Sequence, residues 1–361
     1  MPDLSLRALN RTLLARQHLI EPAPLTPAAL IEQLVAVQGQ EPNWPYLGLR
    51  NRLRRFERAD LAAALAAGEV VRSTTLRRTV HLTTAADFRW LRPTLHELIA
   101  GAVRLAYYRT ELDGIDHAAL AAAGRELLGD RLLTRRELGT ALAERFPERH
   151  VRRLAEAVEV MVPLVHGPEC GEWGRWRNRY VTVGLAEARL GPLAPAPEPE
   201  TLVRRYLAAF GPATVADAQA WSGATRLAPV FAALRPELRV LRDTDGRELF
   251  DLPEAVLADP DTPVPVRFLP AFDNAVLGYR DRRRIVSETD RRRTAAEASA
   301  GVPVYLVDGF VHGRWSLAGS TLRVEPWYPI GNSDDAAVRE EAERTLKFLI
   351  PNGEGAISIV C

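Results

Sequence analysis

The sequence predicts an α+β fold in which modules of helices closed by a β-hairpin are followed by a C-terminal β-rich domain. Proline-rich stretches at 191–199 and 259–265 divide the 361-residue chain into segments of domain size. The segment between them holds three helical stretches and then a hairpin signal, and the same order recurs upstream. Three helices followed by a hairpin form the winged-helix variant of the helix-turn-helix. We therefore predict tandem winged-helix domains.

The first module is assigned to residues 1–110. Its helical pattern starts at Thr26-Pro27, where proline occupies the first turn of a predicted helix. Apolar residues then recur three or four positions apart, which is the spacing of one helix face, so we predict a helix that runs to about Gln38. The other predicted elements are helices over 45–56 and 59–67 and strands over 70–72 and 79–83.

The second module is assigned to residues 111–190. Thr134 and Glu137 have the spacing of a capping box, in which each side chain satisfies a backbone amide at the start of a helix. The residues after Gly167-Pro168 suit a wing that carries aromatic and arginine side chains. The predicted elements are helices over 138–145 and 150–165 and a wing over 173–183.

The third module, residues 200–258, has the clearest signals. Gly211-Pro212 ends its first helix, and Thr214 with Asp217 predicts a capped start for the second. Asp245-Gly246 is a strong hairpin-turn signal, because both residues tolerate the left-handed backbone of such a turn. The predicted elements are helices over 202–210, 214–223 and 225–234 and strands over 238–242 and 248–251.

The C-terminal domain is assigned to residues 264–361 and reads as strand-rich. Asp308-Gly309 predicts a hairpin within 304–315, and a closing helix is expected over 336–348. An arginine-rich segment opens the domain, with seven arginines against three acidic residues over 280–293. A second arginine cluster lies in the first module, within residues 50–58.

Several classes of protein are disfavoured. No apolar run approaches the roughly 18–20 residues of a membrane span, and the N-terminus lacks the pattern of a signal peptide. Two cysteines, Cys170 and Cys361, cannot form a disulfide framework, and no histidine lies near a cysteine pair as in a zinc site. We expect a cytoplasmic protein without a bound metal or membrane contact.

The composition of the basic residues disfavours enzymes that use an amine as a covalent catalyst. Of 47 lysines and arginines, only Lys347 is a lysine, so catalysis through a Schiff base has almost no candidate amine. No nucleophile elbow, phosphate-binding loop or dinucleotide fingerprint occurs, and no cofactor is expected. The arginine clusters suit contacts to DNA phosphates. Their alternative interpretation is a solvated surface of ion pairs.

Gln38-Gly39-Gln40 is the first candidate for chemistry. On a continuous helix two residues two apart diverge, so the glutamines can converge only if the helix ends between them, which Gly39 and Pro42 allow. Two amides could then bind one small polar target such as a water or a sugar oxygen. The alternative is a pair of glutamines at a frayed helix end.

Two further segments stand out. Arg77-Arg78-Thr79-Val80-His81 places a histidine on a predicted strand, where it would be a base, a DNA contact or a structural residue. Asp273-Asn274 precedes the arginine-rich segment and is either part of a site or simply a turn.

Four segments together resemble the AlkZ/YcaQ family of winged-helix DNA glycosylases. They begin with Leu34-Val35-Ala36-Val37-Gln38-Gly39-Gln40 and its continuation to Leu49, and they follow the family's order along most of the chain. The other three are 76–82, 269–282 and 307–315.

The resemblance implies three tandem winged helices and a C-terminal β domain curved around duplex DNA. The family's catalytic motif is Gln, an aliphatic residue, then Gln or Asp, which maps onto Gln38 and Gln40 in the Gln/Gln form that resembles AlkZ. Two positions depart from the pattern, since Gly39 replaces the aliphatic residue and Arg78 replaces a usual glycine. The residues expected to bind DNA are Arg77, Arg78, Thr79, His81, Asp273, Asn274, Arg280, Arg282, Arg283 and Arg284.

The expected activity is that of a monofunctional DNA glycosylase, a monomer that acts on duplex DNA and is associated with the bacterial nucleoid while it does so. It would hydrolyse the N-glycosidic bond of an alkylated purine, chiefly guanine alkylated at ring nitrogen seven, including bulky natural-product adducts or crosslinks. Its role would be base excision repair or self-resistance to a DNA-alkylating antibiotic. The alternative is a non-catalytic winged-helix DNA-binding protein or transcriptional regulator, which would explain the modules but leave the two glutamines without a task.

Overall fold

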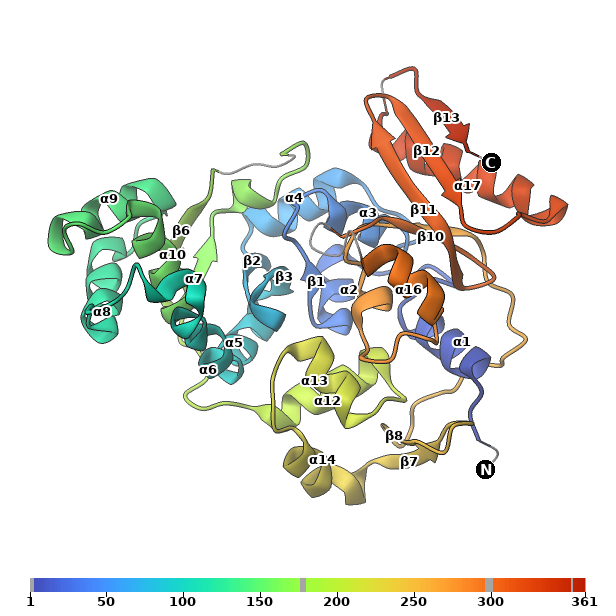
Figure 1. The fold of residues 1–361 in the computed structure, drawn as a ribbon, viewed down its shortest axis with the longest axis horizontal. Helices are drawn as coiled ribbons and strands as arrows, with labels where there is room; N and C mark the ends of the chain where they lie inside the picture. The colour runs from blue at the N-terminus through green and yellow to red at the C-terminus, as the bar shows by residue number, and fades with distance from the viewer. Residues whose placement is uncertain (1–2, 176–179, 296–300, 352, 361) are drawn as a thin grey trace.

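The computed structural model describes residues 3–175, 180–295, 301–351 and 353–360. It shows the predicted mixture of helices and sheets (Figure 1). The first module lies in the middle of the molecule, with the second module at one end and the C-terminal domain at the other. The third module lies below the first in the same view. The first module therefore touches the other parts of the chain, and it carries the glutamine motif.

The first module is built around a three-stranded sheet in the order β1-β3-β2. His81, on the central strand, lies opposite Gln38 on one neighbouring strand and opposite Ser73 on the other. The sheet therefore places the glutamine motif beside the segment 77–81 that the sequence also singled out. The elements are α2 (Pro27–Leu34), β1 (Val37–Gln38), α3 (Trp44–Arg50), α4 (Arg58–Ala66), β2 (Val70–Thr74), η1 (Leu76–Arg78), β3 (Val80–Thr84), α5 (Ala85–Thr94), α6 (His96–Ala100), η2 (Gly101–Arg104) and α7 (Ala106–Arg109).

The predicted helix over 27–38 is too long. Thr26 caps its start as expected, with its hydroxyl accepting from the amide of Ala29, but α2 ends at Leu34. Val35 has a φ of +67°, a left-handed conformation that a β-branched residue rarely adopts, and it turns the chain out of the helix. Gln38 then lies in a strand, because the partner strand β3 supplies a hydrogen-bonding edge that the helical spacing could not reveal.

The second module is helical with a three-stranded sheet in the order β4-β6-β5. The capping box at Thr134 and Glu137 forms as predicted. The predicted helix over 150–165 ends at Met161, because Val162 precedes a proline and is extended. Residues 176–179 of the predicted wing lie outside the described residues. The elements are α8 (His117–Leu128), β4 (Leu133–Thr134), α9 (Arg135–Arg145), α10 (Val151–Met161), β5 (Leu164–His166), η3 (Pro168–Gly171), β6 (Thr182–Leu185) and α11 (Ala186–Leu190).

The third module matches the predicted elements within a few residues. Thr214 and Asp217 form a capping box, and Gly223, with a φ of +79°, ends the second helix. Gly246 supplies the left-handed residue of the hairpin turn. The elements are α12 (Pro199–Phe210), α13 (Val215–Ser222), α14 (Ala228–Leu234), η4 (Arg235–Glu237), β7 (Arg239–Arg242) and β8 (Glu248–Asp251).

The C-terminal domain is a five-stranded sheet in the order β13-β12-β11-β10-β9, in which only the β12–β13 pair is parallel. Asp308 and Gly309 are both left-handed and close the predicted hairpin. Helix α17 shares a buried core with the sheet that includes Trp315 and Val338. The elements are β9 (Arg267–Leu269), α15 (Asn274–Leu277), α16 (Glu288–Ala295), β10 (Val304–Val307), β11 (Phe310–Ala318), β12 (Thr321–Pro326), α17 (Asn332–Leu349) and β13 (Ala356–Ile359).

A helix at the start of the chain, α1 (Leu6–Arg16), was not predicted. The signal for it was present, because Ser5 caps the helix by accepting from the amide of Ala8. Asn10 on this helix donates to the backbone carbonyls of Arg284 and Gly309 at 2.8 Å each. Arg16 forms a 2.8 Å ion pair with Asp251. Helix α1 thus joins the third module to the C-terminal domain.

Candidate active site and nucleic-acid interface

The two glutamines of the motif lean toward the same neighbouring segment. Gln38 is 8% exposed, and its amide oxygen accepts from Nη2 of Arg77 at 3.4 Å. Gln40 is exposed, and its amide oxygen accepts from the backbone amide of Val80 at 3.2 Å. Residues two apart on extended backbone share a side, so the strand allows the amides to come together where a continuous helix would separate them. Both amides contact the segment 77–80, and the convergence of the two on one target remains a prediction.

Arg77 is held in an unusual backbone conformation, with a φ of +52°. Its Nη1 donates to the backbone carbonyl of Trp221 at the end of α13, and its Nη2 lies 3.4 Å from Nε2 of His81. A Cβ added to Gly223 would come within 2.9 Å of the Arg77 Cα, so the third module packs directly against this turn. Burial, with a contribution from the charge of Arg282, lowers the pKa of Arg77 to about 10, which leaves it a cation at neutral pH.

His81 is buried and neutral. Its Nδ1 lies 2.9 Å from the carbonyl oxygen of Thr79, so Nδ1 carries the proton and donates. Its Nε2 is then the acceptor that Arg77 requires. Burial, reinforced by the charge of Arg77, lowers the pKa of His81 to about 3. A histidine in this state acts as a fixed hydrogen-bonding group, which favours the structural interpretation over that of a base.

The turn after Arg77 shows why glycine is usual at position 78 in the family pattern. Arg78 has a φ of +61°, in the region that glycine adopts at little cost. Its side chain is exposed, whereas the hydroxyl of Thr79 points back to the carbonyl of Leu76 at 3.2 Å. The chain therefore carries an arginine at a strained position on the surface, beside the glutamine motif.

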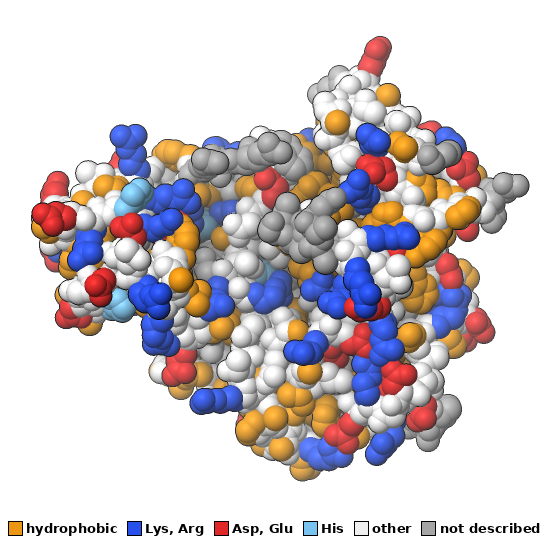
Figure 2. Space-filling model, viewed as in Figure 1, with side chains coloured by type: hydrophobic (Ala, Val, Ile, Leu, Met, Phe, Trp, Pro, Cys, Tyr) orange, Lys and Arg blue, Asp and Glu red, His pale blue; other side chains and the backbone are white. Residues whose placement is uncertain are grey.

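The arginine-rich segment divides into exposed and paired side chains. In Figure 2, basic side chains run across the middle of the face shown, and acidic side chains lie among them. Arg280 is exposed, and its side chain contacts no partner within the described ranges 3–175, 180–295, 301–351 and 353–360. Arg282 is half-buried, and burial lowers its pKa. Arg283 forms 2.7 Å ion pairs with both Asp281 and Asp245.

Three residues expected to bind DNA turn inward instead. Arg284 donates to the carbonyl of Pro212 at 3.0 Å, and its guanidinium lies 3.8 Å from the centre of the Tyr279 ring. Asp273 caps α15 and receives two hydrogen bonds from Arg52, at 2.9 and 2.7 Å. Asn274 donates to the carbonyl of Ala36 at 2.6 Å, just before the motif strand. The Asn274 contact holds the backbone two residues before Gln38, and Asp273 lines the same small cavity as Gln38.

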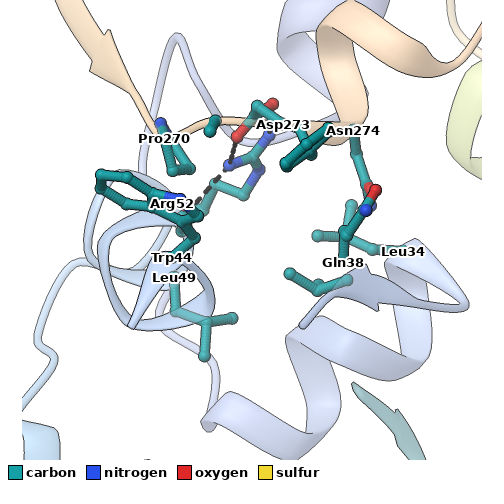
Figure 3. A pocket seen from close by; sticks show the side chains of 12 residues that line it. Leu34, Gln38, Trp44, Leu49, Arg52, Pro270, Asp273 and Asn274 are labelled. Carbon is teal, nitrogen blue, oxygen red and sulfur yellow. Dashed lines mark hydrogen bonds and ion pairs between the residues drawn. The ribbon is translucent and has the colours of Figure 1, made fainter. Parts of the chain in front are cut away.

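A small cavity adjoins Gln38, between the first module and the loop that leads into α15. In Figure 3, Gln38, Leu34 and Asn274 lie on one side of it, with Trp44 and Arg52 opposite. About 10 Å³ is available to the centre of a water molecule, which is room for roughly one water. The cavity has room for a solvent molecule but is too small for a base. The lining residues are Leu34, Val37, Gln38, Trp44, Gly48, Leu49, Arg52, Pro270, Ala271, Phe272, Asp273 and Asn274.

A second and larger cavity shares Pro270, Phe272 and Asp273 with the first. It offers about 320 Å³ and is lined mostly by apolar side chains. Arg282, the half-buried arginine whose charge acts on Arg77, is one of its polar lining residues. The cavity is therefore next to the glutamine motif and large enough for a substituent of several atoms.

One contact in the site involves a residue that the sequence did not single out as functional. Arg72, on β2, donates from Nε to the carbonyl of Gly39 at 3.1 Å. It is 6% exposed. Within a predicted strand an arginine gives no sign of pointing inward, and its partner lies 33 residues away.

In the described part of the chain, no group of three or more His, Cys, Asp or Glu side chains is arranged to hold a metal ion, and no helix is both long and apolar enough to span a bilayer.

Comparison with known families decides which group of proteins shares these features. A family model described as "DNA glycosylase AlkZ-like" matches residues 31–348, which include the motif strand, the Arg77 turn and the arginine-rich segment. The chain belongs to the AlkZ-like DNA glycosylase family.

A sequence match and a structure match of this AlkZ-like chain both come from Streptomyces sahachiroi. A protein named interstrand DNA cross-link repair glycosylase is 28% identical over 254 residues, which are 64% of this chain and 66% of that protein, just under two thirds. The solved structure of the DNA glycosylase AlkZ matches with a TM-score of 0.81 over 99% of this chain and 100% of that one, at 22% identity. The second match shows a shared overall fold. The individual winged helices remain a prediction.

The other departure of this AlkZ-like chain is structurally tolerated. A Cβ added to Gly39 would meet the side chain of Leu82 at 3.5 Å and its backbone amide at 3.6 Å, which are ordinary contact distances. The first carbon of the aliphatic side chain in the family pattern would therefore fit here. Glycine gives the motif backbone more freedom instead, and the contact from Arg72 limits that freedom.

Proposed function

We propose that this chain hydrolyses the N-glycosidic bond of guanine alkylated at ring nitrogen seven in duplex DNA. The observation that carries the proposal is the pair of neutral amides at Gln38 and Gln40, each fixed by a hydrogen bond to its oxygen and placed beside an exposed basic surface. An amide oxygen has two acceptor positions. With one occupied by Arg77 or by the amide of Val80, the other is directed at a water or at the sugar.

The proposed hydrolysis does not require a strong acid or base, so neutral amide side chains are sufficient. Alkylation at ring nitrogen seven makes the base cationic, so it leaves readily and needs little acid catalysis. The transition state resembles an oxocarbenium ion, and amide oxygens held in place stabilise the developing positive charge and orient the attacking water. Asp273, the carboxylate that lines the same small cavity as Gln38, is bound on both oxygens by Arg52 and is unsuited to act as a base.

The lysine content supports a monofunctional enzyme that leaves the strand intact. A glycosylase that also cuts the strand commonly uses an amine to form a Schiff base. The single lysine, Lys347, is exposed on α17 in the C-terminal domain, while the motif strand β1 is in the middle of the molecule (Figure 1). We infer that the product is an abasic site.

Two observations support an extension to bulky adducts and crosslinks. The Streptomyces sahachiroi relative is named for interstrand cross-link repair, and the 320 Å³ cavity beside the motif has room for a substituent larger than methyl. We propose that such adducts, including those of DNA-alkylating natural products, are substrates and that self-resistance is the biological role. Incubation with a crosslinked duplex tests this, because unhooking releases one strand on a denaturing gel.

The central test uses a duplex that carries a single N7-methylguanine. The wild-type protein should release free base, identified by mass spectrometry, and the strand should break only after alkali. The double substitution Gln38→Ala with Gln40→Ala should abolish release at an unchanged melting temperature. Gln33→Ala, at an exposed glutamine of α2, is the matched control.

Two results would contradict the proposal. Full activity in the double variant would remove the glutamines from the mechanism. Tight binding to DNA without base release from the methylated or the crosslinked duplex would favour the alternative, a non-catalytic DNA-binding protein.

A further inference from the structure

A chain of buried polar groups connects the glutamine motif to the second module. It starts at Arg72, whose Nε donates to the carbonyl of Gly39 at 3.1 Å and whose Nη2 donates to the carbonyl of Gln40 at 3.4 Å. Burial lowers the pKa of Arg72 to about 10, so the side chain remains a cation at neutral pH. One rigid guanidinium therefore holds two consecutive peptide carbonyls of the motif.

The remaining nitrogen of Arg72 selects the state of a histidine. Nη1 contacts Nδ1 of His166 at the end of β5. Arginine has donors only, so Nδ1 must accept and the imidazole proton must be on Nε2. That nitrogen lies 2.9 Å from Oε1 of Glu159, which accepts it. Burial lowers the pKa of His166 to about 4, so the ring is neutral at physiological pH, as this arrangement requires.

Glu159 is in turn anchored within the second module. Arg135, at the start of α9, donates to both of its oxygens, at 2.7 and 2.8 Å. Burial would raise the pKa of Glu159, but Arg135 and His166 keep it below its usual range, so it is ionised. A separate 2.5 Å hydrogen bond from Ser73 to the carbonyl of Leu164 holds β2 beside β5. The connection from motif to second module is thus continuous and fully hydrogen-bonded.

We propose that His166 is a positioning residue for base excision. It acts through Arg72 on the peptides of Gly39 and Gln40, and so sets the direction of the Gln40 side chain. The inference rests on the proposed glycosylase function. Gly39 is the reason such a hold is needed, because glycine in place of an aliphatic residue leaves this backbone free to adopt other conformations.

The buried charges support a role beyond packing. Burying Arg72, a glutamate and an imidazole, with Arg135 partly buried beside them, costs desolvation, and apolar side chains of similar volume often stabilise a fold as well or better. What the polar chain adds is a fixed orientation of the Arg72 guanidinium, because each hydrogen bond in the chain forms only in a narrow range of geometries. His166 lines a separate cavity of about 210 Å³ together with Arg72, and neither residue is on the exposed basic surface. Substitution of His166 should therefore leave DNA affinity unchanged.

The test compares His166→Leu with His166→Asn. Leucine removes the acceptor for Arg72, whereas the Oδ1 of asparagine can take the place of Nδ1. Two measurements are made on the full-length protein: hydrogen exchange of residues 36–42, and single-turnover excision of N7-methylguanine alongside the Kd for the same duplex. The amide of Gly39, bonded to the carbonyl of Val80 at 2.9 Å, is the most direct reporter.

We expect His166→Leu to speed exchange in 36–42 at least tenfold and to slow excision by up to about 100-fold, with Kd unchanged. His166→Asn should recover most of both losses. A purely structural role predicts the opposite for asparagine, which would be as damaging as leucine. Val338→Ala, in the core around α17, provides a variant of reduced stability that does not touch the network.

Three results would overturn the proposal: unchanged exchange and excision in His166→Leu, no recovery in His166→Asn, or an equal loss of excision in Val338→Ala at matched melting temperature. Hydrogen exchange does not depend on the substrate. If the wild-type protein releases no base, the glycosylase proposal fails on its own, while the exchange data still decide whether His166 holds the motif.

Discussion

Arg77 donates a 3.4 Å hydrogen bond to the side-chain oxygen of Gln38 while its other terminal nitrogen contacts the backbone carbonyl of Trp221. A single side chain thus joins the first glutamine of the motif to the third module. Arg72 makes the corresponding connection from the second glutamine to the second module. The motif is held from two sides by arginines that the surrounding modules anchor. We propose that these arginines position the motif and that exposed arginines such as Arg280 contact DNA.

Replacing Arg77 tests its role as a positioning residue. Arg77→Leu removes the hydrogen bond to Gln38, so the rate of excision should fall by roughly 10- to 100-fold. The Kd for undamaged duplex should change less than twofold, because this guanidinium is directed at protein groups. Single-turnover rates and binding isotherms measure the two quantities. A large loss of affinity with normal chemistry would instead make Arg77 a phosphate contact.

The arginine-rich segment should show unequal effects on DNA binding. Arg280→Ala should reduce the slope of log K against log salt by about 0.9, the value for one phosphate contact. Arg283→Ala should reduce it less, because Asp281 and Asp245 already neutralise that side chain. Fluorescence anisotropy across a range of salt concentrations gives both slopes. Equal slopes for the two variants would show that Arg283 leaves its ion pairs when DNA binds.

The strained turn at Arg78 makes a prediction about stability. Arg78→Gly should raise the free energy of unfolding by about 0.5–1 kcal/mol relative to Arg78→Ala. A left-handed backbone costs an L-residue about 1–2 kcal/mol. Glycine avoids that cost but loses part of the gain, because its unfolded chain has more conformational entropy. The two variants lose the same side chain, so the comparison isolates the backbone. Chemical denaturation provides the measurement. No difference between them would mean that the turn relaxes at little cost.

The larger cavity should govern tolerance of bulky adducts. Val276 lines it and is half-buried, so Val276→Phe adds volume into the cavity with limited disturbance of the core. The ratio of excision rates for a bulky aromatic N7 adduct and for N7-methylguanine should fall at least tenfold. Both rates are measured on the same duplex sequence. An unchanged ratio would place the bulky group elsewhere.

The buried histidines predict how stability depends on pH. The folded-state pKa values of His81 and His166, about 3 and about 4, lie below the unfolded value of about 6.5. Below pH 6.5 the unfolded chain binds protons that the folded chain excludes, so stability is full above that pH and falls as the pH drops. Each histidine contributes a slope of about 1.4 kcal/mol per pH unit. His81→Gln should lower the slope between pH 6 and pH 5 by about that amount, measured by denaturation at each pH.

Local signals predicted most of the elements in this protein. The capping boxes at Thr134 and Thr214 and the turn at Asp308-Gly309 lie where expected, because each depends only on residues within a few positions. The extra length predicted for the helix after Thr26 shows the limit of such signals. Helical spacing continued to Val37, but a left-handed residue at Val35 and a strand partner more than 40 residues away decided otherwise.

The sequence by itself indicated the mixed α+β class of fold and, through four segments that include Gln38 and Gln40, the family. Only the tertiary structure decided which arginines are free and which are paired. Asp273 reads as a turn residue along the chain, yet it binds Arg52 across 221 positions, and Arg72 meets His166 across 94. The reason is physical: caps and turns are settled by neighbouring backbone, whereas the partner of a buried charge is chosen by whichever distant segment packs against it.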